Sequence, residues 1–124
     1  MTTATEATIT NFRDLRVWQE SVELTKDVYT LCSKLPNDEL YGLASQMKRA
    51  AVSVASNIAE GHARRHRAEY RQHLHIAVGS LAELETQLHI AKELRFVLEG
   101  DTAPLVARIH HLRAMLLTLS QRLR

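Results

Sequence analysis

Apolar residues in the first quarter of the chain recur at alternating spacings of three and four positions, the period of one face of an α-helix. The pattern predicts a helix from Asp14 to Lys34, with Asn11 placed to cap its start. We expect Trp18 and Tyr29 to anchor the core from this helix. Two neighbouring stripes form the wide apolar face that a packed bundle needs: Leu15, Trp18, Val22, Thr25, Tyr29 and Cys32 in one, and Val17, Leu24, Val28, Leu31 and Leu35 in the other.

A second helix is predicted between the Leu35-Pro36 break and Gly61. Proline disfavours helical geometry in the residue before it, and Asn37 suits the N-cap of the segment that follows. Apolar residues at helical spacing continue through Met47 and Ile58. We expect Gly61 to end this helix in the left-handed conformation that glycine adopts readily.

The same helical spacing of apolar residues predicts two further helices. One is predicted from Arg67 to Val97, with Gly79 in its middle allowing a neighbouring helix to pack closely. The last is predicted to begin at a cap on Asp101 or Thr102. Four amphipathic helices with short connections predict an all-α fold, an antiparallel up-down-up-down four-helix bundle. We assign residues 1–11 to a flexible N-terminal tail and residues 12–124 to one bundle domain.

A few apolar residues fall outside these stripes. Single exposed apolar side chains are normal, but several on one pair of helices indicate a second buried surface. We therefore predict that the chain forms a homo-oligomer. The residues concerned are Ile76, Val78, Ile90 and Leu117.

The composition is that of an ordinary globular protein. Apolar residues make up 45% of the 124 residues and charged residues 24%, and the formal net charge is +2. The single cysteine, Cys32, excludes an intramolecular disulfide and fits a reducing compartment. The first residues lack the pattern of a signal peptide, and no apolar run is long enough to span a membrane. We expect a cytoplasmic location and no membrane partner.

Several strings of the sequence resemble one known family. The opening Phe12-Arg-Asp-Leu-Arg-Val-Trp-Gln19 is similar to the start of the 23S ribosomal RNA intervening-sequence proteins, a four-helix-bundle family. Arg49-Ala-Ala-Val-Ser53 and Glu83-Leu-Glu-Thr-Gln87 also resemble family strings, and Asn57-Ile-Ala-Glu-Gly61 is the most specific of them. The resemblance covers about residues 12–97, in order.

The resemblance implies a bundle that assembles as a ring-shaped homopentamer. Members are similar to the accessory proteins of diversity-generating retroelements, which share the pentameric barrel, bind nucleic acid and partner a reverse transcriptase. The implied partners are therefore further copies of the chain, RNA or DNA, and a reverse transcriptase or other nucleic-acid enzyme. The family name records a gene location, so it does not imply that this chain binds ribosomal RNA.

Two basic segments are the candidate nucleic-acid-binding sites. One follows Gly61, and the other lies in the last helix, where no acidic residue occurs from Thr102 onward. Arginine suits phosphate because its planar guanidinium donates paired hydrogen bonds. No aromatic residues are interleaved for base stacking, so we expect backbone-directed binding of low sequence specificity. The candidates are Arg64, Arg65, Arg67, Arg71, Arg108 and Arg113.

A second interpretation of these charges stays open. In this interpretation, the charged side chains only keep the helix faces hydrated, and the protein is a structural or protein-interaction module without nucleic-acid binding. Asn57, Glu60 and Gly61 are assigned to a polar clasp that fixes the turn into the third helix. In this clasp, Glu60 is expected to pair with Arg64 or Arg65 because a carboxylate opposes the dipole at a helix C-terminus.

Catalysis and metal binding find little support in the sequence. His66, Glu69 and His73 share one helix face, but their spacing matches no known zinc motif. The chain lacks the nucleophile elbow, the phosphate-binding glycine loop and the deaminase signature. Cys32 lies on an apolar stripe, which is typical of an inert core thiol. We predict a non-enzymatic protein that uses no metal and no cofactor.

Overall fold

The computed structural model describes residues 11–124, and in this part of the chain helices are the only regular secondary structure. The predicted all-α fold with four helices is confirmed. The predicted N-terminal tail lies outside the described residues except for Asn11. The long helices are α1 (Arg16–Cys32), α2 (Leu43–Ala63), α3 (Arg67–Glu93) and α4 (Glu99–Arg122), and two short 3-10 helices, η2 (Phe12–Asp14) and η3 (Asn37–Glu39), precede α1 and α2.

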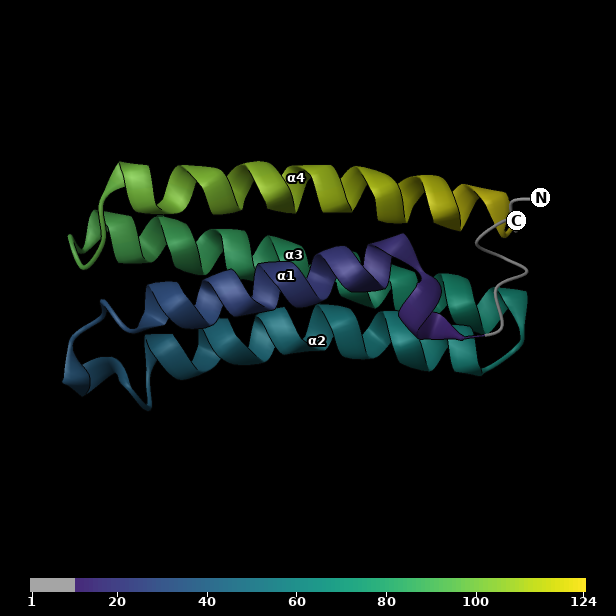
Figure 1. Cartoon of the computed structure of the whole chain (residues 1–124), viewed down its shortest axis with the longest axis horizontal. Coiled ribbons are helices and arrows are strands. Elements are labelled where there is room, and N and C mark those ends of the chain that lie inside the picture. Colours follow the sequence, from purple (N-terminus) through teal and green to yellow (C-terminus); the bar gives the residue numbers. More distant parts are fainter. Residues whose placement is uncertain (1–10) are drawn as a thin grey trace.

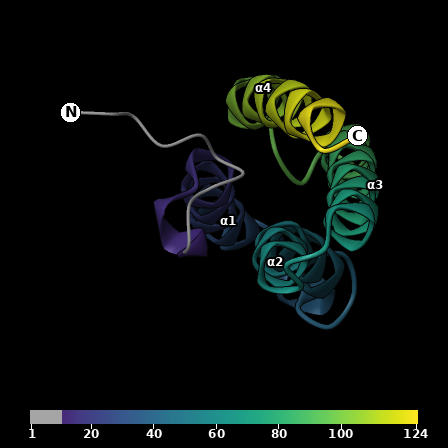
Figure 2. The same ribbon diagram turned by 90° about the vertical axis from the view of Figure 1, so that its right-hand side faces the viewer.

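The four helices lie side by side along one axis (Figure 1). Each begins at the end of the molecule where the preceding one stops, so the α1 start, the α2–α3 turn and the α4 end lie toward the same end. Figure 2, which looks along this axis, shows the helices in chain order around a common centre. Contacts join α1 to α2, α2 to α3, α3 to α4 and α4 to α1.

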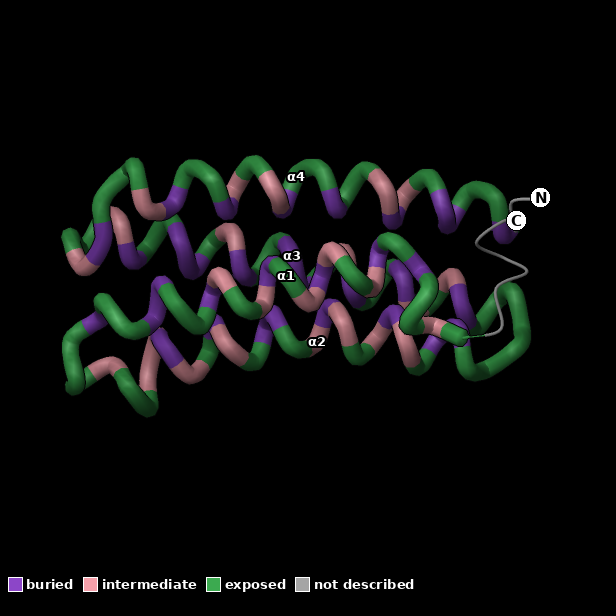
Figure 3. Tube along the Cα trace, in the orientation of Figure 1, coloured by how far each residue is buried: buried purple, intermediate pink, exposed green. Residues whose placement is uncertain are grey.

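The buried residues face this centre from all four helices (Figure 3). On α1 the stripe that contains Leu24 and Val28 is buried, as the spacing predicts. The other stripe is buried at its two ends, Leu15 and Cys32, but not between them. Tyr29 is 47% exposed, and Trp18 is half-buried against Phe12, with ring centroids 5.2 Å apart. The expectation that Tyr29 anchors the core is therefore wrong.

The second helix begins later than predicted. Asn37 is the first residue of η3 rather than the N-cap of α2, and α2 starts after Gly42. Gly42 has φ −104° and ψ −112°, outside the regions that residues with a Cβ favour. The Glu39 carboxylate accepts a hydrogen bond from the Leu43 backbone N–H at 3.4 Å and so stabilises the first turn of α2.

The third helix ends four residues earlier than predicted, at Glu93. Arg95 adopts a left-handed conformation with φ 63°, and the Phe96 N–H donates to the Ala91 carbonyl at 3.0 Å, which closes the helix end. The chain then turns inward so that Val97 is buried. No glycine marks this stop, so the sequence carried no local signal for it.

The remaining helix ends also differ by a few residues. Asn11 Oδ1 accepts from the Arg13 N–H at 2.9 Å and caps η2, while α1 begins only at Arg16. The fourth helix begins at Glu99, and the Asp101 carboxylate reaches back to the Leu98 N–H at 2.9 Å. Asp101 therefore stabilises the first turn from within the helix, not from the cap position.

Candidate nucleic-acid interface

The α2–α3 junction presents the first basic segment, and it is built differently from the prediction. α2 continues through Gly61 to Ala63, and no glycine among the described residues has a positive φ. The left-handed residue is Arg65, with φ 58°. Gly61 is needed for another reason, because a Cβ at this position would lie 2.6 Å from the Cβ of His73 on α3. The predicted glycine C-cap is wrong, and Gly61 permits close helix contact instead.

Asn57 links α2 to α3 one turn before this junction. Its Nδ2 donates to the Ser53 carbonyl at 2.9 Å, which fixes the orientation of the amide because a carbonyl only accepts. The Asn57 Oδ1 therefore accepts from His73 Nδ1 on α3, at 3.0 Å. Ser53 Oγ also lies 2.9 Å from Ser80 Oγ of α3. This polar contact holds α2 and α3 in register and sets where the arginines leave the bundle.

The arginines after Gly61 are exposed at this junction. Arg64 Nη2 lies 3.3 Å from Glu60 Oε1, and both side chains are about half exposed, at 50% and 55%. Such a surface pair contributes little to stability, so Arg64 can exchange its partner at small cost. Arg71 lies one turn further along α3 and is half-buried. Arg65 and Arg67 line a hollow of about 230 Å³, whose other lining residues are His62, His66, Tyr70 and Leu123.

The α4 candidates are not part of this cluster. Arg108 forms ion pairs with Asp27 and, at 3.8 Å, with Glu20, both on α1. Two carboxylates thus already neutralise its guanidinium, and Arg108 ties α4 to α1. Arg113 is exposed, and it forms no ion pair within residues 11–124.

The fold adds arginines that the candidate set did not contain. We define the basic end as the end of the bundle where α2 turns into α3. It comprises the first turns of α1 and α3, the last turns of α2 and α4, and the chain segments that adjoin them. Its arginines outnumber its carboxylates, and the opposite end has an acidic excess. The basic end has seven arginines, Arg13, Arg16, Arg64, Arg65, Arg67, Arg122 and Arg124, and three carboxylates, Asp14, Glu60 and Glu69. The opposite end has three cations, Lys34, Lys92 and Arg95, and five carboxylates, Asp38, Glu39, Glu93, Glu99 and Asp101.

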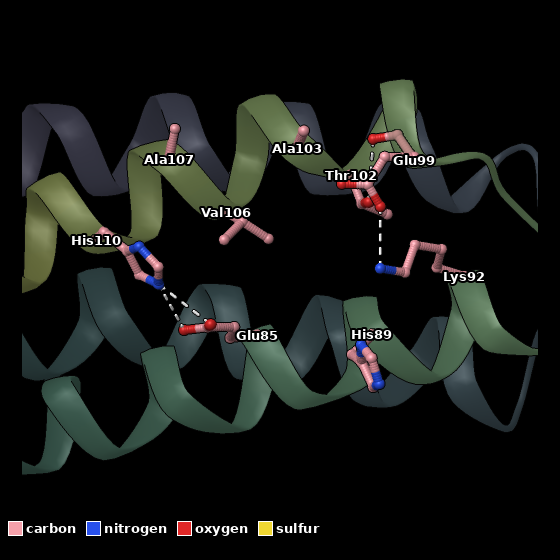
Figure 4. Close-up of a pocket in the computed structure, with 9 residues that line it drawn as sticks. All are labelled: Glu85, His89, Lys92, Glu99, Thr102, Ala103, Val106, Ala107 and His110. Atoms are coloured by element: carbon pink, nitrogen blue, oxygen red, sulfur yellow. Dashed lines mark hydrogen bonds and ion pairs between the residues drawn. The ribbon is translucent and has the colours of Figure 1, made fainter.

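A groove of about 400 Å³ between α3 and α4 is a second place where charged residues gather (Figure 4). Two polar contacts cross the groove: His110 Nε2 lies 3.1 Å from Glu85, and Lys92 Nζ lies 2.9 Å from Glu99. The hydrogen bond to Glu99 raises the pKa of Lys92 above its usual value. The two contacts clasp α3 to α4, and Val106 lies between them. The arrangement therefore fits a helix–helix contact better than a ligand site.

The described part of the chain offers neither a metal site nor a reactive thiol. No group of three histidine, cysteine or carboxylate side chains in residues 11–124 is arranged to hold a metal ion. His73 contacts Asn57 instead of forming a ligand set with His66 and Glu69. Cys32 is buried, which raises the pKa of its thiol and keeps it protonated, and its Sγ donates weakly to the Ala44 carbonyl at 3.7 Å. No described helix combines the length and the apolar character needed to cross a bilayer.

Comparison with known proteins identifies the family. The model of the 23S rRNA-intervening sequence protein family matches residues 13–118, from the first 3-10 helix to the last turns of α4. The chain belongs to this family. The match extends the similarity beyond the residues that carried it in the sequence, because it includes most of the fourth helix.

A solved structure has the same fold as this family member. It is a protein of unknown function from the S23 ribosomal protein family of Bacteroides thetaiotaomicron VPI-5482. The TM-score is 0.77 at 19% identity, and the alignment covers 84% of this chain and 97% of that one. At this identity the likeness shows the fold alone. No curated protein matches the chain, and the family match indicates no catalytic family.

Proposed function

We propose that the protein is a non-enzymatic nucleic-acid accessory protein, whose basic end binds the backbone of RNA or DNA. It would act as a homopentameric ring of antiparallel up-down-up-down bundles, alone or beside a nucleic-acid enzyme such as a reverse transcriptase. A cytoplasmic location belongs to the same proposal. The observation that carries it is the charge difference between the two ends of the bundle.

The basic end suits phosphate better than bases. Arginine donates paired, charge-assisted hydrogen bonds to phosphate oxygens, and release of counterions from the backbone favours binding. The aromatic rings at this end are engaged inside the chain: Phe12 packs on Trp18, and Tyr70 is buried against His62. Stacking on bases therefore contributes little, and we expect binding of low sequence specificity.

An exposed apolar groove supports the proposed assembly. Two hollows of about 440 and 740 Å³ lie along the seam of α1 and α2, and they share Tyr29 and Val52. We call this surface the α1–α2 groove. Leu40 and Tyr41, which are 51% and 92% exposed, continue it at one end. An apolar surface of this kind is typical of a protein–protein interface. In a ring, each basic end would be repeated five times, which multiplies a modest charge.

The alternative function is a protein-interaction module without nucleic-acid binding. The α1–α2 groove favours it, because an apolar groove alone is sufficient for binding a protein partner. The two functions differ in what the basic end does. Only the nucleic-acid function requires the cations there to meet an anion.

A gel-shift titration with single-stranded RNA and DNA at about 50 and 200 mM salt tests the proposal. We expect binding that weakens steeply with salt, because each phosphate contact releases counterions. Arg64→Glu/Arg65→Glu should weaken binding by about a hundredfold or more at low salt, since two cations become anions at the proposed contact. Circular dichroism checks that the variant stays folded.

The matched control reverses two cations at the opposite end, in Lys34→Glu/Arg95→Glu. It changes the net charge equally, so a loss of binding in both variants would mean that only total charge matters. Absence of any shift at low salt would contradict the nucleic-acid function and favour the interaction module.

A further inference from the structure

The balance of charge at the seam between α1 and α4 changes along the length of the seam. Near its middle, Arg108 of α4 pairs with Asp27 and Glu20 of α1, so the charges cancel. Toward the basic end the seam opens into a hollow of about 280 Å³, which we call the α1–α4 hollow. It is lined by Arg16 of α1 and by His111, Ala114, Met115, Thr118 and Arg122 of α4.

The α1–α4 hollow brings cations together without a carboxylate. Its charged or titratable lining consists of two guanidinium groups and one imidazole. Within residues 11–124, neither Arg16 nor Arg122 forms an ion pair. The carboxylate one turn after Arg16 is that of Glu20, which pairs with Arg108 instead. α4 cannot supply a counter-charge, because no acidic residue follows Asp101 in the sequence.

Like charges held around one hollow repel each other unless an anion lies between them. Two guanidinium forks from different helices can each donate paired hydrogen bonds to a phosphate, and the Thr118 hydroxyl on the lining adds a donor. We propose that the α1–α4 hollow is a binding site for one phosphate group, held by Arg16 and Arg122. The ligand is a phosphate dianion or a phosphate monoester, or else one phosphate of a nucleic-acid backbone.

This site is distinct from the arginines after Gly61. Its two arginines come from the first turn of α1 and the last turn of α4, whereas Arg64, Arg65 and Arg67 come from the α2–α3 junction. Each group can therefore be removed without touching the other. The site lies within the basic end, but the inference does not depend on nucleic-acid binding, because its two arginines would hold inorganic phosphate even if the α2–α3 junction binds nothing.

The test is a titration of the full chain with inorganic phosphate at low salt, followed by NMR of the backbone amides. We expect shifts centred on Arg16, His111 and Arg122. Arg16→Ala and Arg122→Ala should each weaken phosphate binding by about tenfold, the effect of losing one charge-assisted contact. Arg95→Ala, which removes one exposed arginine at the opposite end, should leave the affinity unchanged.

Two oligonucleotides of the same sequence distinguish the sources of the phosphate. If only the form with a 5′-phosphate competes with inorganic phosphate, the site takes a terminal monoester. Equal competition by the 5′-hydroxyl form assigns it to the backbone. An affinity for phosphate that is unchanged in both arginine variants, or a wild-type chain that does not respond to phosphate, would overturn the proposal. Arg64→Glu/Arg65→Glu should keep the phosphate response, so failure here and failure of the proposed function are separable.

Discussion

Gly61 and Gly79 both lie inside helices, but their surroundings differ. A Cβ at Gly61 would lie 2.6 Å from the Cβ of His73 and 3.2 Å from the ring of Tyr70. His73 Cβ is bonded directly to the backbone, so only a movement of α2 away from α3 relieves that contact. Gly79 has nothing within 4 Å of the same position. The expectation that Gly79 allows close packing within the chain is wrong, and Gly61 has this role instead.

We predict opposite effects when each glycine is replaced by alanine. Gly61→Ala should lower the free energy of unfolding by about 1–2 kcal/mol, because overpacking between helices outweighs the gain in helix propensity. Gly79→Ala should raise it by about 1 kcal/mol, since alanine is the better helix former and meets no obstacle. Urea denaturation at equal protein concentration measures both. A stabilised Gly61→Ala variant would show that α2 and α3 separate at little cost.

The residue scale also shows the limit of local prediction. The sequence around Gly61 has the form of a helix stop, but the deciding neighbour, His73, is twelve positions away on another helix. The helix ends two residues later, at Ala63, and the left-handed residue beyond it is Arg65, a residue type that seldom adopts a positive φ. Neither fact has a signal in the nearby sequence.

At the scale of elements, Asp101 joins the start of α4 to the end of α1. Its carboxylate accepts from Lys34 Nζ at 2.7 Å and from the Leu98 N–H at 2.9 Å. The hydrogen bond from Lys34, together with that from Leu98, lowers the pKa of Asp101 below its ordinary value. A lowered folded-state pKa means that the contribution to stability is present above the ordinary pKa and is lost as pH falls.

We predict that Asp101→Asn lowers the melting temperature at pH 7, where the wild-type carboxylate is ionised. The difference from the wild type should shrink as pH falls below about 4, because the wild-type carboxyl then becomes protonated as well. Thermal melts from neutral to acidic pH measure this. Asp38→Asn serves as the control, since Asp38 is an exposed acid at the same end. Parallel curves for Asp101→Asn and the wild type would contradict the assignment.

The four helices themselves followed from apolar spacing, whereas their ends did not. Each end depends on a contact that the period cannot encode, such as the Glu39 carboxylate at the start of α2 or the Asp101 carboxylate at the start of α4. The periodic face extends over many residues, so an error of a few positions at either end leaves it recognisable.

At the scale of the whole molecule, the α1–α2 groove is an apolar surface that residues 11–124 leave uncovered. Val52 lies where its two hollows meet and is 41% exposed. Lys48 Nζ lies 4.9 Å from the centre of the Tyr29 ring, so a cation lies beside the apolar side chains that line the groove. A second copy of the chain, as in the proposed pentamer, would remove this surface from water.

We predict that the wild-type chain has a pentameric mass in light scattering at micromolar concentration. Val52→Glu should reduce the mass to that of a monomer, since a carboxylate in the groove would lose its hydration on assembly. Leu98→Glu is the control, because Leu98 is an apolar residue, 74% exposed, that does not line the groove. Dissociation of the control alone would place the subunit contact elsewhere.

Part of the candidate interface was predictable, and the structure changed the rest. Arg64, Arg65 and Arg67 are exposed beside one another, as adjacent residues in a polar stretch are expected to be. Arg108 belongs to an ion pair because α1 lies against α4, and Arg16 lines the α1–α4 hollow with Arg122 for the same reason. In each case the partner is about 80 or more positions away in the sequence.

Apolar periodicity and short strings predicted a four-helix all-α member of this family, because both are local properties that survive in any arrangement of the helices. Which charged side chains meet depends on how the helices pack. Packing α1 against α4 neutralised Arg108, packing α2 against α3 required a glycine at position 61, and the arrangement of the helices gathered arginines at one end. Charge interactions depend on distance in space, and distances between helices are fixed by packing rather than by the period of any one helix.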